Sequence, residues 1–200
     1  MMNNVHLKAK QVAAFFLELN ASSEDNDLTQ LKLQKLLYYA QGVCLAISGK
    51  PLFEDKIKAW PHGPVCNAVY DSFPRGSSLL TPYEDNDGLV SMLSKKDKHL
   101  ISLINRVYGR YCAFTLRNMT HQESPWRETM CISYYGEIEH DLIKNHFEKL
   151  LAHPNDYALQ HSANDDEMED IIDLLAVIKS DYSEDQSTMT HEEVCAKWCA

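Results

Sequence analysis

Residues 28–42 read LTQLKLQKLLYYAQG, and their pattern sets the expected architecture of the chain. Apolar residues recur here at spacings of three and four, which is typical of the buried face of a helix. Thr29 stands just before this pattern, where its hydroxyl can cap a helix. After Ile47, residues 48–51 read SGKP, and a glycine followed by a proline is typical of a helix end. The pattern therefore predicts a capped core helix over residues 29–47.

Helical spacing extends to both sides of this segment, so a mainly α fold is expected. Ser94 is a candidate cap within one of these helical stretches. The three longer predicted helices span residues 8–19, 89–111 and 137–151, and shorter helical pieces are expected at residues 65–73 and 115–119.

Non-helical structure is expected in two places. Residues 52–60 lead into the rigid turn PHGP at 61–64 and are predicted to be extended. The polar loop 77–88 is a candidate for a second extended piece, so a small β element is expected near 52–60 and 77–88. Residues 120–126 are predicted to form a polar turn, with a fixed loop around Trp126.

The chain is predicted to comprise one compact helical domain and a tail. The domain spans residues 1–154, because His153 and Pro154 end the last strong helical pattern. Residues 155–169 are polar and acidic, residues 169–179 are predicted to form a short amphipathic helix, and residues 180–190 show no apolar periodicity. We expect residues 155–200 to be an acidic, partly mobile appendage.

Composition restricts the classes of partner. The chain has 200 residues, of which 44% are hydrophobic, and a formal net charge of −10. Binding to nucleic acid depends on lysine and arginine neutralising phosphates, so this charge argues against a DNA-binding phage regulator. No apolar run approaches the ~18 residues that a membrane helix needs, and no secretory signal is recognisable, so a cytoplasmic protein is expected.

Catalytic and cofactor signatures are missing from the sequence. There is no nucleophile elbow, no phosphate-binding loop and no dinucleotide motif, so neither catalytic residues nor cofactors are predicted. His191, Cys195 and Cys199 share one helical face, but zinc sites usually need four ligands, and we interpret this triplet as helix packing rather than metal binding. A hydrolase that uses His62 or His121 with a nearby cysteine or glutamate is the enzymatic alternative.

Aromatic and turn residues concentrate between positions 38 and 70. Tyrosine and tryptophan combine a large apolar surface with one polar group, which suits a recognition groove beside a rigid turn. The same residues could equally build a tyrosine-rich core. Residue chemistry alone leaves both interpretations open.

Several segments of the chain resemble the Panacea domain of the SocA-like antitoxin family. Residues 28–42 resemble its opening motif, and residues 49–53 and 57–65 (IKAWPHGPV) resemble the turn that follows. Val69-Tyr70 also matches, and residues 120–126 (THQESPW) resemble a second signature closed by Pro-Trp. The resemblance covers about residues 8–150 and leaves out the acidic appendage.

The resemblance implies a function in protein binding without catalysis. Members of the family are often phage-associated proteins that bind and neutralise a toxin encoded by an adjacent gene, and one member delivers its toxin to the ClpXP protease. Neither the toxin nor the oligomeric state follows from the sequence. The motif positions, which we expect to bind a partner or define the domain, are Tyr38, Gln41, Trp60, His62, Gly63, Pro64, Tyr70, His121 and Trp126. Of these, Trp60, the 62–64 turn, His121 and Trp126 are expected to pack into one unit that the histidine fixes by hydrogen bonds.

Overall fold

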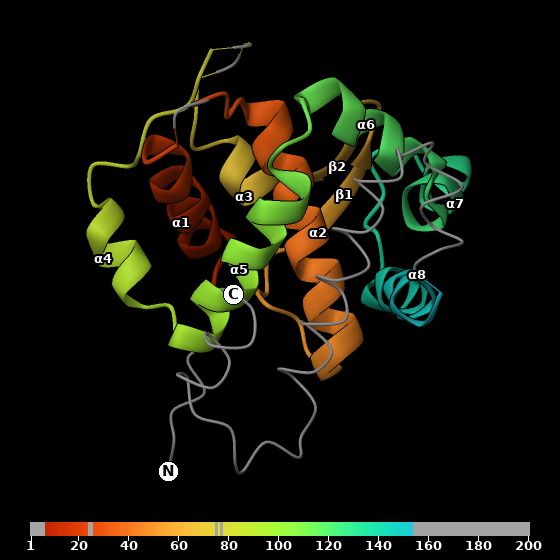
Figure 1. Cartoon of the computed structure of the whole chain (residues 1–200). Coiled ribbons are helices and arrows are strands. Elements are labelled where there is room, and N and C mark those ends of the chain that lie inside the picture. The colour runs from red at the N-terminus through yellow and green to blue at the C-terminus, as the bar shows by residue number, and fades with distance from the viewer. Residues whose placement is uncertain (1–6, 24–25, 75, 77, 154–200) are drawn as a thin grey trace, which may run out of the picture.

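A computed structural model describes residues 7–23, 26–74, 76 and 78–153 (Figure 1). The predicted appendage at 155–200 and the His191, Cys195 and Cys199 triplet lie outside these residues. Within the described part, the chain is mainly helical with a small antiparallel sheet, which confirms the predicted fold class. None of the described helices is long and apolar enough to cross a membrane.

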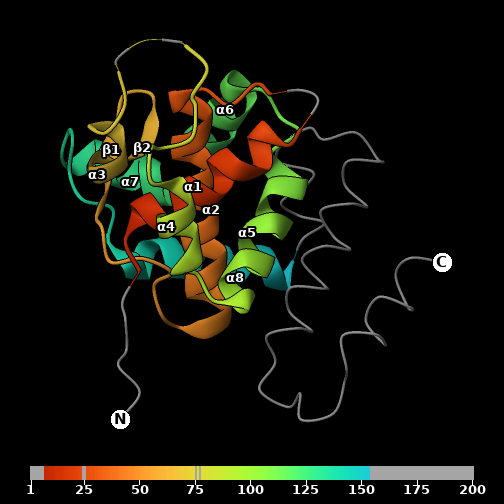
Figure 2. The ribbon, with the colours of Figure 1, turned by 90° about the vertical axis from the view of Figure 1, so that its left-hand side faces the viewer.

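Helix α2 (Gln30–Ser48) runs through the middle of the molecule, and the other elements pack around it (Figures 1 and 2). Its predicted ends are confirmed. The Thr29 hydroxyl accepts a hydrogen bond from the Lys32 backbone N–H at 3.3 Å, and Gly49 ends the helix with φ 68°. Every residue from 32 to 45 is buried, as expected for a helix that has neighbours on all sides.

Helices α1 (Ala9–Ala21) and α5 (Lys95–Tyr108) pack on one side of α2, and α4 (Asn86–Ser91) packs on α1. The predicted helix 89–111 is therefore divided in two. Ser94 accepts a hydrogen bond from the Asp97 N–H, and the Asp97 carboxylate accepts one from the Ser94 N–H, each at 3.1 Å. This reciprocal capping box begins a new helix, so the candidate cap is confirmed and the continuous helix is not.

Strands β1 (Ile57–Trp60) and β2 (Gly63–Cys66) form the sheet, and the short helix α3 (Asn67–Tyr70) follows. Trp60 pairs with Gly63 across a two-residue turn. A β element within 52–60 is thus confirmed over residues 57–60, but its partner is 63–66 and not the 77–88 loop. In that loop, Leu79 forms only an isolated bridge with Thr29. Pairing across a tight turn requires less loop-closure entropy than pairing across a long loop.

The far edge of β1 pairs with the segment before helix α8 (His140–Ala152). The Ile138 N–H donates to the Ile57 carbonyl at 2.8 Å, and the Tyr135 N–H donates to the Ala59 carbonyl at 3.0 Å. The predicted helix 137–151 therefore starts three residues late, because its first residues make backbone hydrogen bonds to a strand.

Helices α6 (Ala113–Gln122) and α7 (Ser124–Ile132) replace the predicted loop around Trp126, and that prediction is wrong. Only Glu123 separates the two helices. Pro125 lies in the first turn of α7, where its missing N–H costs no hydrogen bond. The buried Glu123 carboxylate accepts a hydrogen bond from the Tyr39 hydroxyl at 3.0 Å and lies 3.7 Å from His146 Nε2, which joins this junction to α2 and α8.

Candidate partner-binding pocket

The turn between β1 and β2 rests on a buried lysine of α2. Gly63 follows the turn with φ 100°, a backbone conformation that residues with a Cβ atom rarely adopt. The fully buried Lys35 extends beneath it and donates from Nζ to the Pro64 carbonyl at 2.9 Å. Burial and, to a smaller extent, the positive charge of Arg117 lower the pKa of Lys35 to about 7. The turn is therefore fixed to α2 by a lysine that readily loses its charge.

Lys35 was not among the predicted site residues, although the sequence contains a signal for it. Leu31 lies four positions before it, and Tyr38 and Tyr39 lie three and four positions after it. Residues at these spacings share one helical face. A lysine in the middle of an apolar face indicates a buried ammonium group with a specific acceptor.

His121 and Trp126 form a stacked pair behind the turn. Their rings are 3.9 Å apart and nearly parallel, and Trp126 Nε1 donates to the Trp60 carbonyl at 2.8 Å. The expected unit of Trp60, His121 and Trp126 is thus present. The expected hydrogen bonds from the histidine are not, because His121 Nε2 is buried without a partner in the described part of the chain. Burial, with help from the charges of Arg117, Lys35 and His62, lowers the pKa of His121 to about 4.

Tyr38 and Gln41 support the fold from within the core. Tyr38 packs edge-on against Phe147 with ring centroids 5.5 Å apart. The Gln41 side-chain oxygen accepts hydrogen bonds from the Leu52 and Phe53 N–H groups at 2.9 and 3.1 Å, and its nitrogen donates to the Phe53 carbonyl. Neither residue exposes any surface. Gln41 thus holds the segment that leads into β1, Tyr38 packs against α8, and neither residue lines the pocket in this structure.

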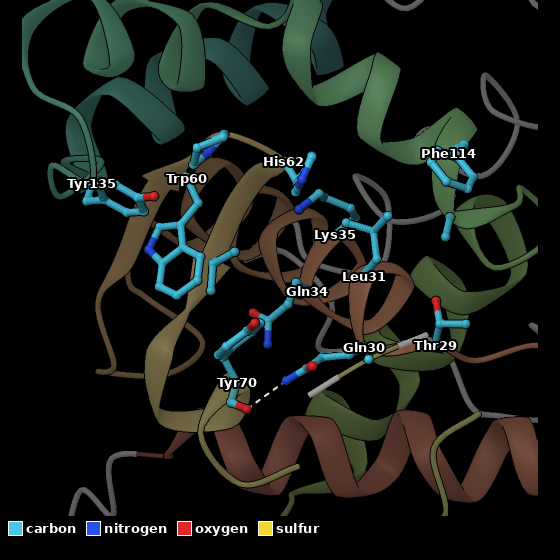
Figure 3. A pocket seen from close by; sticks show the side chains of 14 residues that line it. Thr29, Gln30, Leu31, Gln34, Lys35, Trp60, His62, Tyr70, Phe114 and Tyr135 are labelled. Carbon is cyan, nitrogen blue, oxygen red and sulfur yellow. Dashed lines mark hydrogen bonds between the residues drawn. The ribbon is translucent and has the colours of Figure 1, made fainter. Parts of the chain in front are cut away.

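A pocket of about 630 Å³ opens between the first turns of α2, the hairpin turn and the start of α6 (Figure 3). Aromatic side chains supply much of its wall. The Trp60 ring lies 4.9 Å from that of Tyr70 and 5.4 Å from that of Tyr135. Of the predicted residues, Trp60, His62 and Tyr70 line the pocket, whereas Gly63, Pro64, His121 and Trp126 do not. The remaining lining residues are Thr29, Gln30, Leu31, Gln34, Lys35, Pro61, Val65, Gly76, Ala113, Phe114 and Tyr135.

Large apolar side chains are exposed at two edges of this pocket. Phe114, at the start of α6, is 70% exposed, and Tyr135, after α7, is 51% exposed. Ile132 and Tyr134 continue the Tyr135 side and are also exposed. Sequence reasoning missed these residues, because an isolated apolar residue in a polar stretch carries no sign of its exposure. An aromatic pocket with an apolar rim is typical of a protein-interaction site.

The described residues offer no catalytic arrangement around His62 or His121. Within the described ranges, no hydrogen bond joins either histidine to a cysteine or glutamate. Burial raises the pKa of the Cys66 thiol to about 11, which is unfavourable for a nucleophile. No group of three histidine, cysteine or acidic residues that could hold a metal occurs among the same residues. The hydrolase alternative therefore gains no support here.

Comparison with known proteins agrees with the resemblance seen in the sequence. Residues 33–127 match the family described as Antitoxin SocA-like, Panacea domain, which confirms the resemblance for this part of the chain. Antitoxin SocA of Caulobacter vibrioides (strain NA1000 / CB15N) is 42% identical over 65 residues, which is 32% of this chain and 34% of that relative. The match thus spans about a third of the relative's length. No solved structure matches the chain.

Proposed function

We propose that this protein is an antitoxin-like binding protein that neutralises a toxin encoded by an adjacent gene through direct contact. The observation that carries the proposal is the aromatic pocket with its apolar rim, which is built at the motif turn of a SocA-like Panacea domain. Burial of exposed aromatic side chains provides much of the affinity in protein interfaces. We propose no catalytic step, and we place the protein in the cytoplasm, where such a toxin would act.

The charge of the chain supports a particular kind of toxin. A net charge of −10 favours association with a basic partner, because complementary charge steers encounter and disfavours wrong partners. Toxins that act on RNA are commonly basic, since they must approach phosphates. We therefore propose a basic, RNA-directed toxin as the partner.

The function is tested by expressing the neighbouring open reading frame alone and together with this protein. We expect growth to stop in the first case and to resume in the second. A harmless neighbour, or a toxicity that this protein does not relieve, would refute the pairing.

Replacing Phe114 with glutamate should weaken the complex with the toxin. The substitution removes apolar area that would be buried in the contact, and the new carboxylate would have to lose its hydration. An aromatic side chain that becomes buried in an interface can contribute about 2 kcal/mol, which is about 30-fold in Kd. The matched control is Met92→Glu, because Met92 is also an exposed apolar residue, 53% exposed, and does not line the pocket. Calorimetric titration of the purified toxin measures both affinities. Equal losses in the two variants would exclude the pocket rim as the contact.

Masking of the toxin and delivery to a protease differ in the amount of toxin that remains. Direct masking leaves the toxin level unchanged when the two proteins are co-expressed. Delivery to ClpXP lowers the level in cells that contain the protease and not in cells that lack it. Immunoblotting of the toxin after synthesis is stopped distinguishes the two mechanisms.

A further inference from the structure

Gln34 presents an unused hydrogen-bond donor in the wall of the pocket. Its side chain is 2% exposed, and its Oε1 accepts a hydrogen bond from the Cys66 N–H at 2.7 Å. This bond fixes the orientation of the amide, so the Nε2 group must face away from Cys66. That group is buried without a partner among the described residues, although the side chain lines the pocket (Figure 3). A buried donor of this kind costs about 1–3 kcal/mol unless an acceptor reaches it.

Positive charge near the pocket is not balanced. The side chain of Lys35 lines the wall next to Gln34, and its ammonium group meets only the Pro64 carbonyl and no carboxylate in the described part of the chain. Arg117 and His62, the groups that act on this region together with Lys35, are also basic. Basic groups thus gather at this site, and charges interact more strongly there than in water.

The rest of the wall suits an apolar group. Trp60, Tyr70, Tyr135 and Phe114 provide aromatic surface around the same opening. Trp60 also carries a buried Nε1 group without a partner among the described residues. The pocket therefore combines aromatic walls, unused donors and excess positive charge. An anionic group attached to an apolar side chain meets all three conditions.

We propose that the pocket binds a carboxylate of the partner protein, presented beside an apolar side chain, with Gln34 as hydrogen-bond donor and Lys35 as the source of positive charge. The inference rests on the proposed function, since it takes the partner to be a protein chain. The carboxylate can belong to an aspartate or glutamate side chain or to a C-terminus. Both sources share the chemistry that the pocket recognises, and a titration with short peptides separates them.

The test uses two pairs of N-acetylated peptides. Ac-Phe-Glu-NH2 and Ac-Phe-Gln-NH2 differ in a side-chain carboxylate, and Ac-Gly-Phe-OH and Ac-Gly-Phe-NH2 differ in a terminal one. The full-length protein is labelled with ¹⁵N, and the indole N–H signal of Trp60, assigned with Trp60→Phe, reports binding. The Trp126 indole is an internal reference, because its N–H is already hydrogen-bonded to the Trp60 carbonyl.

We expect at least one acid to bind about tenfold more tightly than its amide, since hydrogen bonds and charges of this kind contribute that much. The pair that shows the preference identifies the source of the carboxylate. Equal affinities within both pairs, or no movement of the Trp60 signal, would overturn the proposal. These measurements need no toxin, so their outcome is independent of the growth rescue. They can support the carboxylate site when the rescue fails, and they can refute it when the rescue succeeds.

Lys35→Met should abolish the preference for the acid, whereas Lys58→Met should leave it unchanged. Lys58 lies on β1 and does not line the pocket, so it controls for the loss of one positive charge. Thermal unfolding of each variant shows whether it is folded. If Lys35→Met does not fold, the peptide pairs on the unaltered protein still decide the question.

The acid preference should also depend on pH. Lys35 has a pKa of about 7 and therefore loses its charge as the pH rises from 6 to 8. Affinity for the acid peptide should fall by up to about tenfold over this range, whereas affinity for the amide should stay constant. Arg117 and His62 are the other basic groups that act on this region. Titrations of His62→Gln isolate the contribution of Lys35. A pH-independent preference in that variant would contradict the assigned role of Lys35.

Discussion

Gly63→Ala should lower the free energy of unfolding by about 3 kcal/mol, because backbone strain and overpacking each contribute about 1–3 kcal/mol. Gly63 has φ 100°, where a Cβ is unfavourable. That Cβ would lie 2.5 Å from Lys35 Cε and 2.9 Å from Thr120 Oγ1. Lys35 is fully buried and bonded to the Pro64 carbonyl, so it cannot move aside without losing that bond. Urea unfolding followed by circular dichroism measures the change.

Gly49→Ala is the matched control for Gly63→Ala. Gly49 also has a positive φ, 68°, but nothing lies within 4 Å of an added Cβ. Only the left-handed conformation costs energy there, about 1–2 kcal/mol, and the stiffer unfolded chain offsets part of it. If the two variants are equally stable, the contact between the turn and Lys35 contributes nothing.

Gly42→Ala should also destabilise the protein, against the intrinsic preference of a helix for alanine. Gly42 lies inside α2, where alanine is favoured by about 1 kcal/mol. However, an added Cβ would lie 2.6 Å from Phe147 Cζ and closer still to two other ring carbons. Phe147 is fully buried, so α8 would have to shift. Overpacking of this kind costs about 3 kcal/mol, which leaves a net loss of about 2 kcal/mol.

A double-mutant cycle with Phe147→Leu tests the cause. Phe147→Leu should lower the free energy of unfolding less in the Gly42→Ala variant than in the natural chain. We expect the two effects to differ by a coupling energy of about 1–3 kcal/mol. Gly88→Ala in α4 is the control, because its Cβ meets only the movable carboxylate of the exposed Asp85. Additive effects of the two core substitutions would show that α8 does not pack on α2 at this glycine.

Of the fourteen residues that line the pocket, sequence reasoning singled out three, Trp60, His62 and Tyr70. They stood out because aromatic residues beside a Pro-Gly turn are unusual in composition. Phe114 and Tyr135 were missed, because they reach the pocket from a helix and a connection that are distant in sequence. The loop expected at Trp126 was wrong for a different reason: the polar residues 120–126 were interpreted as a turn, although Pro125 lies at a position where helices accept proline.

The sequence by itself determined the features that depend on neighbours along the chain. These are the amphipathic helices, the caps at Thr29 and Ser94, the glycine end of α2 and the segments that resemble the Panacea domain. Only the tertiary structure decided which strand pairs with β1, how Lys35 is buried and which donors in the pocket stay unused. The physical reason is sequence distance: Lys35 and Pro64 are 29 residues apart, and Tyr39 and Glu123 are 84 apart. Such contacts depend on packing and burial, which local preferences do not specify.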